Sequence, residues 1–131
     1  MSNVKPFIKL VALEEEFSVC KVADYSKIDL EKQFVFTGAT DAEKSLVCPT
    51  RLVPANTVER NDGWRALRIE GTLDFSLIGI LAGISKFLAD NEIGIFVIST
   101  YNTDYIFTRT VDFDHALMVL TKAGYEKISY T

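Results

Sequence analysis

The chain has 131 residues, of which 48% are hydrophobic and 24% are charged, and its net charge is −4 at pH 7. This length and composition suit one domain of ordinary size or two small halves with a sizeable core, and they argue against a disordered chain. The acidic balance argues against a nucleic-acid-binding protein, because such proteins normally present a basic surface.

Targeting signals and redox chemistry are constrained by a few residues. No apolar run reaches membrane-spanning length, and Lys86 interrupts the best candidate. Lys9 breaks the only apolar stretch near the N-terminus and no small-residue cleavage site follows, so we expect a cytoplasmic protein that does not enter a membrane. Cys20 and Cys48 lie in strand-like runs without metal-ligand spacing; buried thiols are the main expectation, and a disulfide is the lesser one.

The first third of the chain reads as β-rich. Residues 7–13 and 17–22 are strand-like runs joined by three glutamates, which predicts an antiparallel hairpin. Residues 24–33 are polar and fit either a turn or a single turn of helix. A third strand is expected at residues 34–37.

Residues 41–44 are then expected to form a brief helical turn, with Thr40 as its cap. A fourth strand is predicted at residues 45–48, where Pro49 ends it. Residues 50–63 show no period and are rich in turn formers, so we interpret them as a connector between two halves.

A strand, a loop and a helix follow. Residues 64–69 alternate as a strand, and from residue 77 the apolar residues recur at the spacing of an amphipathic helix: Leu77, Ile80, Leu81, Ile84 and Leu88. Ser76 stands where a side chain caps a helix N-terminus. Gly79 and Gly83 each weaken such a helix by about 1 kcal/mol relative to alanine. Close helix–sheet packing is the favoured explanation for Gly83, whereas Gly79 fits equally well a close approach by a ligand.

The rest of the chain predicts two strands, a helix and a strand. The strands are expected at residues 93–98, 104–109 and 125–130. The helix has Asp112 as its N-cap, Gly124 as its C′ residue and an apolar stripe comprising Phe113, Ala116, Leu117, Leu120 and Ala123. From residue 64 the order is therefore β-α-β-β-α-β, the ferredoxin-like α+β arrangement with two helices on one face of an antiparallel sheet.

Residues 93–98 are apolar on both faces, although helices cover only one face of such a sheet. We expect the other face to be covered by the N-terminal half or by a second chain, and hence a homodimer.

Three segments resemble the ACT domain, a small amino-acid-binding regulatory module: Trp-Arg-Ala-Leu-Arg-Ile-Glu-Gly at 64–71, Leu-Asp-Phe-Ser-Leu-Ile-Gly-Ile-Leu-Ala at 73–82 and Ile-Ser-Thr-Tyr-Asn-Thr-Asp-Tyr at 98–105. They are most similar to a branch that includes cytosolic arginine sensors of animals and small bacterial proteins. The family's Asp-x-x-Gly turn falls on residues 76–79, where Ser76 replaces the aspartate. The resemblance implies an ACT domain at 64–131, and residues 1–63 look like a smaller, degenerate ACT-like half.

The resemblance implies a non-enzymatic regulatory protein with an amino acid as ligand and no cofactor, whose output is contact with a regulated protein partner. A ligand carboxylate suits the free N–H groups near residues 76–79, and its ammonium needs an acceptor. In this strand order the loop at 99–103 returns to the same edge as the loop before the first helix. The ligand-binding candidates are therefore Asp74, Phe75, Ser76, Leu77, Ile78, Gly79, Thr100, Tyr101 and Asp104.

Each candidate has a structural alternative. Asp104 fits an ammonium acceptor or a turn residue bonded to its own backbone. Asp74 is more readily a loop or capping residue, Phe75 lines a pocket or fills the core, and Tyr101 stacks on a ligand or faces a partner subunit. His115, the only histidine, is expected on an exposed polar face without a catalytic role. The alternative function is a homodimeric interaction module whose ligand site is vestigial.

Overall fold

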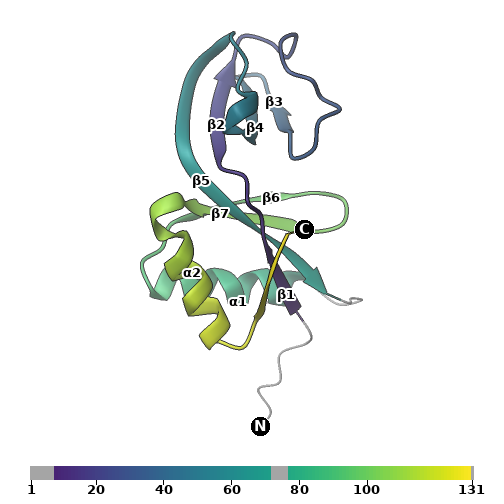
Figure 1. Ribbon diagram of the computed structural model, residues 1–131. Helices are drawn as coiled ribbons and strands as arrows, with labels where there is room; N and C mark the ends of the chain where they lie inside the picture. Colours follow the sequence, from purple (N-terminus) through teal and green to yellow (C-terminus); the bar gives the residue numbers. More distant parts are fainter. Residues whose placement is uncertain (1–7, 72–76, 131) are drawn as a thin grey trace. The chain divides into compact units, whose positions relative to one another are not determined.

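The computed structural model describes residues 8–71 and 77–130, except the side chains of residues 71, 77 and 78. These residues form eight strands, two α-helices and one 3-10 helix (Figure 1). In chain order the elements are β1 (Ile8–Ala12), β2 (Phe17–Val22), β3 (Phe36–Ala39), β4 (Lys44–Pro49), η1 (Thr50–Leu52), β5 (Thr57–Gly71), α1 (Leu77–Asp90), β6 (Ile95–Ser99), β7 (Asp104–Arg109), α2 (Thr110–Lys122) and β8 (Glu126–Ser129).

The chain forms two compact units. The inserted unit is Glu15–Trp64, and the helical unit combines Met1–Glu14 with Arg65–Thr131. Strand β5 gives its first residues to the inserted unit and its last residues to the helical unit. A boundary between an N-terminal and a C-terminal domain at residues 63 and 64 stays a prediction, but strand β1 belongs to the same compact unit as both helices.

The sheet of the helical unit has the strand order β6-β7-β5-β1-β8. Strands β5, β6, β7 and β8 with α1 and α2 make the β-α-β-β-α-β order, so the predicted ferredoxin-like α+β fold is confirmed. Strand β1 is an addition to it. It runs antiparallel to β5, with Leu10 opposite Ile69, and parallel to β8, with Leu10 opposite Lys127.

The predicted hairpin of residues 7–13 and 17–22 is therefore wrong, although both strands exist. Strand β1 pairs with β5 and β8, whereas β2 pairs with β4 and β5. The physical reason is burial: Ile8, Leu10 and Ala12 lie on the face of β1 that joins the core of the helical unit. A hairpin with β2 would leave that apolar face without this core.

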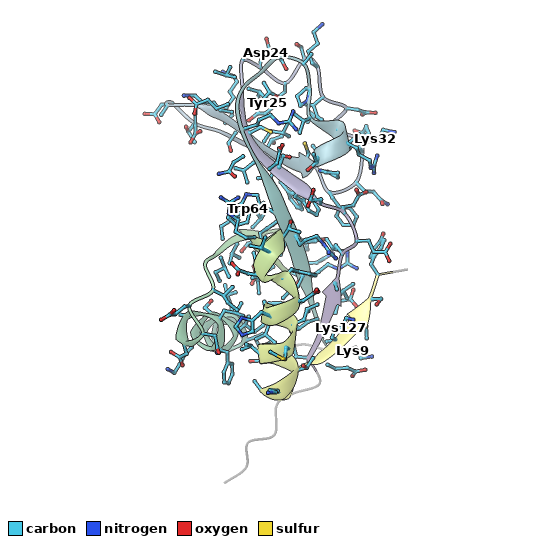
Figure 2. The ribbon with its side chains drawn as sticks, turned by 60° about the vertical axis from the view of Figure 1, so that its left-hand side comes forward. Lys9, Asp24, Tyr25, Lys32, Trp64 and Lys127 are labelled. Atoms are coloured by element: carbon cyan, nitrogen blue, oxygen red, sulfur yellow. The ribbon has the colours of Figure 1, made fainter. Side chains whose placement is uncertain are left out.

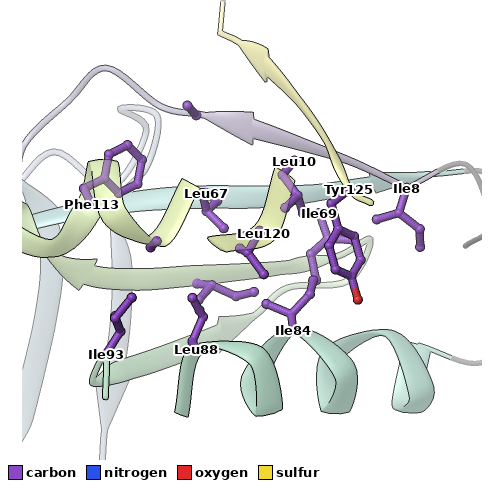
Figure 3. Close-up of a cluster of buried hydrophobic side chains, with 13 residues drawn as sticks. Ile8, Leu10, Leu67, Ile69, Ile84, Leu88, Ile93, Phe113, Leu120 and Tyr125 are labelled. Carbon is purple, nitrogen blue, oxygen red and sulfur yellow. The ribbon is translucent and has the colours of Figure 1, made fainter. Parts of the chain in front are cut away.

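Helices α1 and α2 and strands β1, β5 and β7 supply most of the buried core of the helical unit, and residues of β6 pack against it. Ile84 and Leu88 of α1 and Leu120 of α2 are fully buried and point at the strands (Figure 3). The helical spacing of apolar residues thus marks the buried stripe of each helix, as the sequence predicts.

The ends of α2 confirm one capping prediction and correct another. Arg109 is the N-cap, and Asp112 lies inside the first turn, so Asp112 is not the cap; there its charge still favours the positive helix end. Gly124 has φ 108°, and its N–H donates to the Thr121 carbonyl at 3.1 Å, the C-terminal geometry predicted for it.

The inserted unit is a four-stranded antiparallel sheet with the order β3-β4-β2-β5. Its largest difference from expectation is at residues 50–63, which are not a connector, because β5 begins at Thr57. Asn61, Asp62 and Gly63 resemble turn formers, but β2 offers them a pairing partner. Gly63 takes φ 89° where the register with β2 shifts, so it forms a bulge rather than a loop.

Smaller corrections concern the segment between β2 and β4. Residues 24–33 form turns, which is one of the two alternatives left open by the sequence. Strand β3 covers Phe36–Ala39 rather than 34–37. Residues 41–44 are not helical. The Thr40 hydroxyl nevertheless accepts the N–H groups of Ala42 and Glu43, each at 3.1 Å, so its capping bonds exist in a hairpin turn.

Cys20 and Cys48 are buried free thiols, in agreement with the main expectation. They lie on one face of the inserted unit with Leu46 and Val22. Burial raises the pKa of Cys48 to about 12 and also raises the pKa of Cys20. Both groups are therefore neutral at pH 7. In the described part of the chain, no helix has the length and apolar character needed to span a bilayer.

Candidate functional site

The β6–β7 loop lies beside the end of strand β5. The Thr103 hydroxyl donates a hydrogen bond of 2.5 Å to the Ile69 carbonyl, two residues before β5 ends. Residues 72–76 then connect β5 to α1, which begins at Leu77. The β6–β7 loop therefore lies at the end of the sheet where β5 ends, as the strand order predicts.

Hydrogen bonds within the β6–β7 loop hold its shape. The Thr100 N–H donates to the Thr103 carbonyl at 2.8 Å, and the Thr100 hydroxyl donates to the same oxygen at 3.1 Å. Ser99 and Asp104 are opposite each other as the last pair of the β6–β7 ladder. The loop is thus a four-residue turn, closed at its base and tied to β5.

Asp104 is a buried carboxylate at the base of this loop. It is 7% exposed and shares its side of β7 with Ile106, a member of the core between sheet and helices. The Ser99 hydroxyl donates a hydrogen bond to its Oδ1 atom. Among the described residues, no ion pair reaches Asp104. A buried carboxylate that has a hydroxyl but no cation beside it suits a ligand that brings a positive charge.

The tip of the loop points into solvent. The side chain of Tyr101 is fully exposed, and Thr100 is also exposed. Both remain free to touch a ligand or a partner. Neither contributes to the core.

The other candidates lie near the start of α1. Asp74, Phe75 and Ser76 fall outside the described residues. Leu77 and Ile78 open the first turn of α1, and their side chains also lie outside the description.

The two glycines of α1 differ in their surroundings. Gly79 is exposed, and a Cβ atom there meets no atom of the described residues within 4 Å. A Cβ atom on Gly83 lies 3.1 Å from the Tyr125 hydroxyl oxygen. Gly83 therefore allows α1 to pack closely against Tyr125, the explanation favoured from the sequence.

Sequence reasoning missed Ser99 and Thr103, which fix the position of Asp104 and of the loop. The signal lay in the ladder register: a four-residue loop between β6 and β7 makes Ser99 and Asp104 a pair. His115 is exposed on α2, as expected. Within the described ranges, no group of three His, Cys, Asp or Glu side chains is placed to hold a metal ion.

Comparison with known proteins places this fold. Residues 59–122 match the family model of the ACT domain, and the chain therefore contains an ACT domain over this range. No curated protein matches the sequence.

Solved structures share the fold over most of the chain. A crystal structure of an Agobacterium tumefaciens protein is 28% identical, with a TM-score of 0.83, and the match covers 97% of this chain and 96% of that one. A Vibrio cholerae protein of unknown function, described as a possible transport protein, is 20% identical with a TM-score of 0.68, covering 89% and 90% of the two chains. Aspartate kinase of Clostridium acetobutylicum, an allosteric enzyme, is 17% identical with a TM-score of 0.62; the match covers 84% of this chain and 33% of the kinase.

Proposed function

We propose that the protein is a non-enzymatic regulatory protein that binds a free amino acid between the β5–α1 loop and the β6–β7 loop. The observation that carries this proposal is the buried Asp104 carboxylate at the base of the β6–β7 loop. ACT domains are regulatory small-molecule-binding modules, and this site fits that role.

The two charged groups of an amino acid find complementary partners at this edge. Asp104 accepts hydrogen bonds from the ligand ammonium, and a hydrogen bond to a charged group contributes about 1.5–3 kcal/mol. The first turn of α1 offers backbone N–H groups that the helix itself leaves unpaired, together with the positive end of the helix dipole. The ligand carboxylate binds there.

Ligand binding at this edge changes how the protein contacts a partner. Tyr101 is exposed on the same four-residue turn whose base holds Asp104. A ligand that settles on Asp104 favours one state of this turn, and a protein partner or second subunit contacts Tyr101 differently in that state. The protein acts in the cytoplasm as a homodimer.

A calorimetric screen against the twenty common amino acids tests the proposal. We expect one or a few to bind. Asp104→Asn keeps the shape of the side chain and removes its charge, so we expect affinity for the bound amino acid to fall by roughly ten- to hundred-fold with little change in thermal stability.

Asp90→Asn is the matched control. Asp90 is exposed at the far end of α1, where it pairs with Lys86 at 3.1 Å. Its variant should bind as the wild type does. If Asp104→Asn loses thermal stability and keeps its affinity, Asp104 is a structural residue and the site lies elsewhere.

A second candidate function is a homodimeric interaction module with a vestigial ligand site. The fully exposed Tyr101 favours it, since an exposed aromatic ring at the tip of a turn suits protein–protein contact. Absence of binding by all twenty amino acids, together with a stable dimer, would select this function.

A further inference from the structure

We propose that each chain binds a single amino acid, at Asp104, because the inserted unit is a second copy of the ACT strand arrangement whose own ligand corner is closed. This inference rests on the function proposed above. It concerns how many sites the chain has and which unit carries them.

The strand order of the inserted unit repeats that of the helical unit. In the order of the chain, β2, β3, β4 and β5 take the places that β5, β6, β7 and β8 take in the helical unit. The inserted sheet is ordered β3-β4-β2-β5, and the helical sheet is ordered β6-β7-β5-β8 once the additional strand β1 is set aside. Four strands can be ordered in a sheet in many ways, so the same order in both units indicates that they share one strand arrangement.

The loops that join the second and third strands of each unit have the same geometry. Each has four residues and begins with threonine. In the inserted unit, the Thr40 N–H and hydroxyl donate to the Glu43 carbonyl at 2.9 and 3.3 Å. In the helical unit, Thr100 makes the same two bonds to the Thr103 carbonyl at 2.8 and 3.1 Å.

The match continues through the third strand. Strands β4 and β7 each have six residues, and a helix starts with threonine directly after each, at Thr50 and Thr110. The preceding N-cap residues have similar dihedral angles, φ −53° and ψ 137° in one unit and φ −60° and ψ 145° in the other. The third and fourth strands are connected through the 3-10 helix η1 in the inserted unit and through the longer helix α2 in the helical unit.

The residues that would bind a ligand ammonium differ between the copies. Ser99 and Asp104 close the β6–β7 ladder, and the corresponding pair of the β3–β4 ladder is Ala39 and Lys44. Lys44 is exposed, whereas Asp104 is buried. The inserted unit thus presents a cation, which repels an ammonium group, where the helical unit presents the acceptor.

The other half of the corner is also closed in the inserted unit. Residues 23–35 form turns, so no helix offers free N–H groups or a dipole after β2. The Asp24 carboxylate is occupied by the Ser26 N–H at 3.0 Å, the Ser26 hydroxyl and the Asn56 amide at 3.0 Å. Asp24 and the neighbouring Tyr25 lie in this turn segment (Figure 2).

Equilibrium dialysis of the full chain against a mixture of the twenty common L-amino acids counts the sites. The bound amino acids are quantified per chain as the concentration of the mixture rises. We expect a plateau at one per chain in the wild type. Asp104→Asn should shift half-saturation to concentrations roughly ten- to hundred-fold higher.

Lys44→Gln and Asp24→Asn are matched controls in the inserted unit, and we expect both to keep the wild-type plateau and half-saturation. A plateau at two per chain, or a changed half-saturation in either control, overturns the inference and leaves the proposed function standing. No bound amino acid in the wild type contradicts the inference and the proposed function together.

Discussion

Two serine–aspartate hydrogen bonds show how surroundings decide what a carboxylate does. In the inserted unit, the buried Ser18 hydroxyl donates to Asp62 at 2.5 Å, and Arg60 binds the same carboxylate at 3.1 Å. Asp62 is thus paired with a cation of its own unit, and we expect this network to hold the adjacent bulge at Gly63 in place. Asp104 has its serine but, among the described residues, no cation, which makes it the better candidate for a ligand contact.

Acid sensitivity should report the Asp62 network. The hydrogen bond from Ser18 and the neighbouring Arg60 lower the pKa of Asp62 below its ordinary value of 3.8. A lowered pKa contributes stability above the unfolded value, and this contribution is lost as the pH falls through the folded value. We expect Asp62→Asn to be less stable than the wild type at pH 7 and to approach it below about pH 4. Urea unfolding at pH 7 and pH 3 measures both differences.

Ser18→Ala separates the hydrogen bond from the charge. Removing the Ser18 hydroxyl should lower the free energy of unfolding at pH 7 by about 1–3 kcal/mol. This buried hydroxyl hydrogen-bonds both Asp62 and Thr50, the latter at 2.8 Å, and both bonds are lost. Equal stability of Ser18→Ala and the wild type would show that the network does not hold the bulge.

At the scale of elements, α1 combines good helical periodicity with two glycines that have different reasons to be there. Ile84 and Leu88 fix its buried face. Gly83 faces Tyr125, whose ring also packs edge-on against Phe87 with centroids 6.2 Å apart. A Cβ atom on Gly79 meets no atom of the described residues within 4 Å.

Alanine substitutions should therefore separate the two glycines. Gly79→Ala removes a helix-weakening residue and brings its methyl group against none of the described residues, so we expect a gain of about 0.5–1 kcal/mol in unfolding free energy. Gly83→Ala makes the same change but forces the Tyr125 hydroxyl to move, so the gain should be absent or reversed. Thermal unfolding of both variants gives the comparison.

The double variant Gly83→Ala with Tyr125→Phe isolates the contact. If the Tyr125 hydroxyl is the obstacle, Gly83→Ala should be more favourable in the Tyr125→Phe background than in the wild type. Additive effects would assign the cost of Gly83→Ala to another contact. Gly79→Ala also tests the ligand site. If the bound amino acid approaches Gly79 closely, the added methyl group should lower the affinity for it.

At the scale of the whole molecule, strand β6 should be part of a dimer interface. Among the described strands it is the last at one edge of the helical unit, and it pairs with β7 on its inner side. Its residues Ile95 to Ile98 are apolar and only partly buried, and an edge of this kind invites pairing with another chain. Light scattering at micromolar concentration should give the mass of two chains. The mass of one chain at that concentration would leave β6 as an unpaired edge and contradict the prediction.

The amino-acid sequence alone determined the parts that depend on local periodicity. The positions of α1 and α2, the exact span of β7 and the C-terminal role of Gly124 follow from side-chain spacing and from the φ that a residue tolerates. The β-α-β-β-α-β order followed from these elements. The placing of Asp104 beside a loop edge followed from that order.

Tertiary structure alone decided which strands pair and which polar residues are buried. Strand β1 pairs with β5 and β8, which are both far from β1 in the sequence. This position between them buries Ile8 and Leu10 in the core shared with the helices. The first residues of β5 look like a loop but become a strand once β2 supplies their hydrogen bonds. Strand pairing is non-local, and a hydrogen bond to a distant chain segment outweighs weak local preference for a turn, so no local pattern could reveal it. For the same reason, the burial of Asp104 and the cation at Lys44 distinguish the two units only after folding has set both ladders in register.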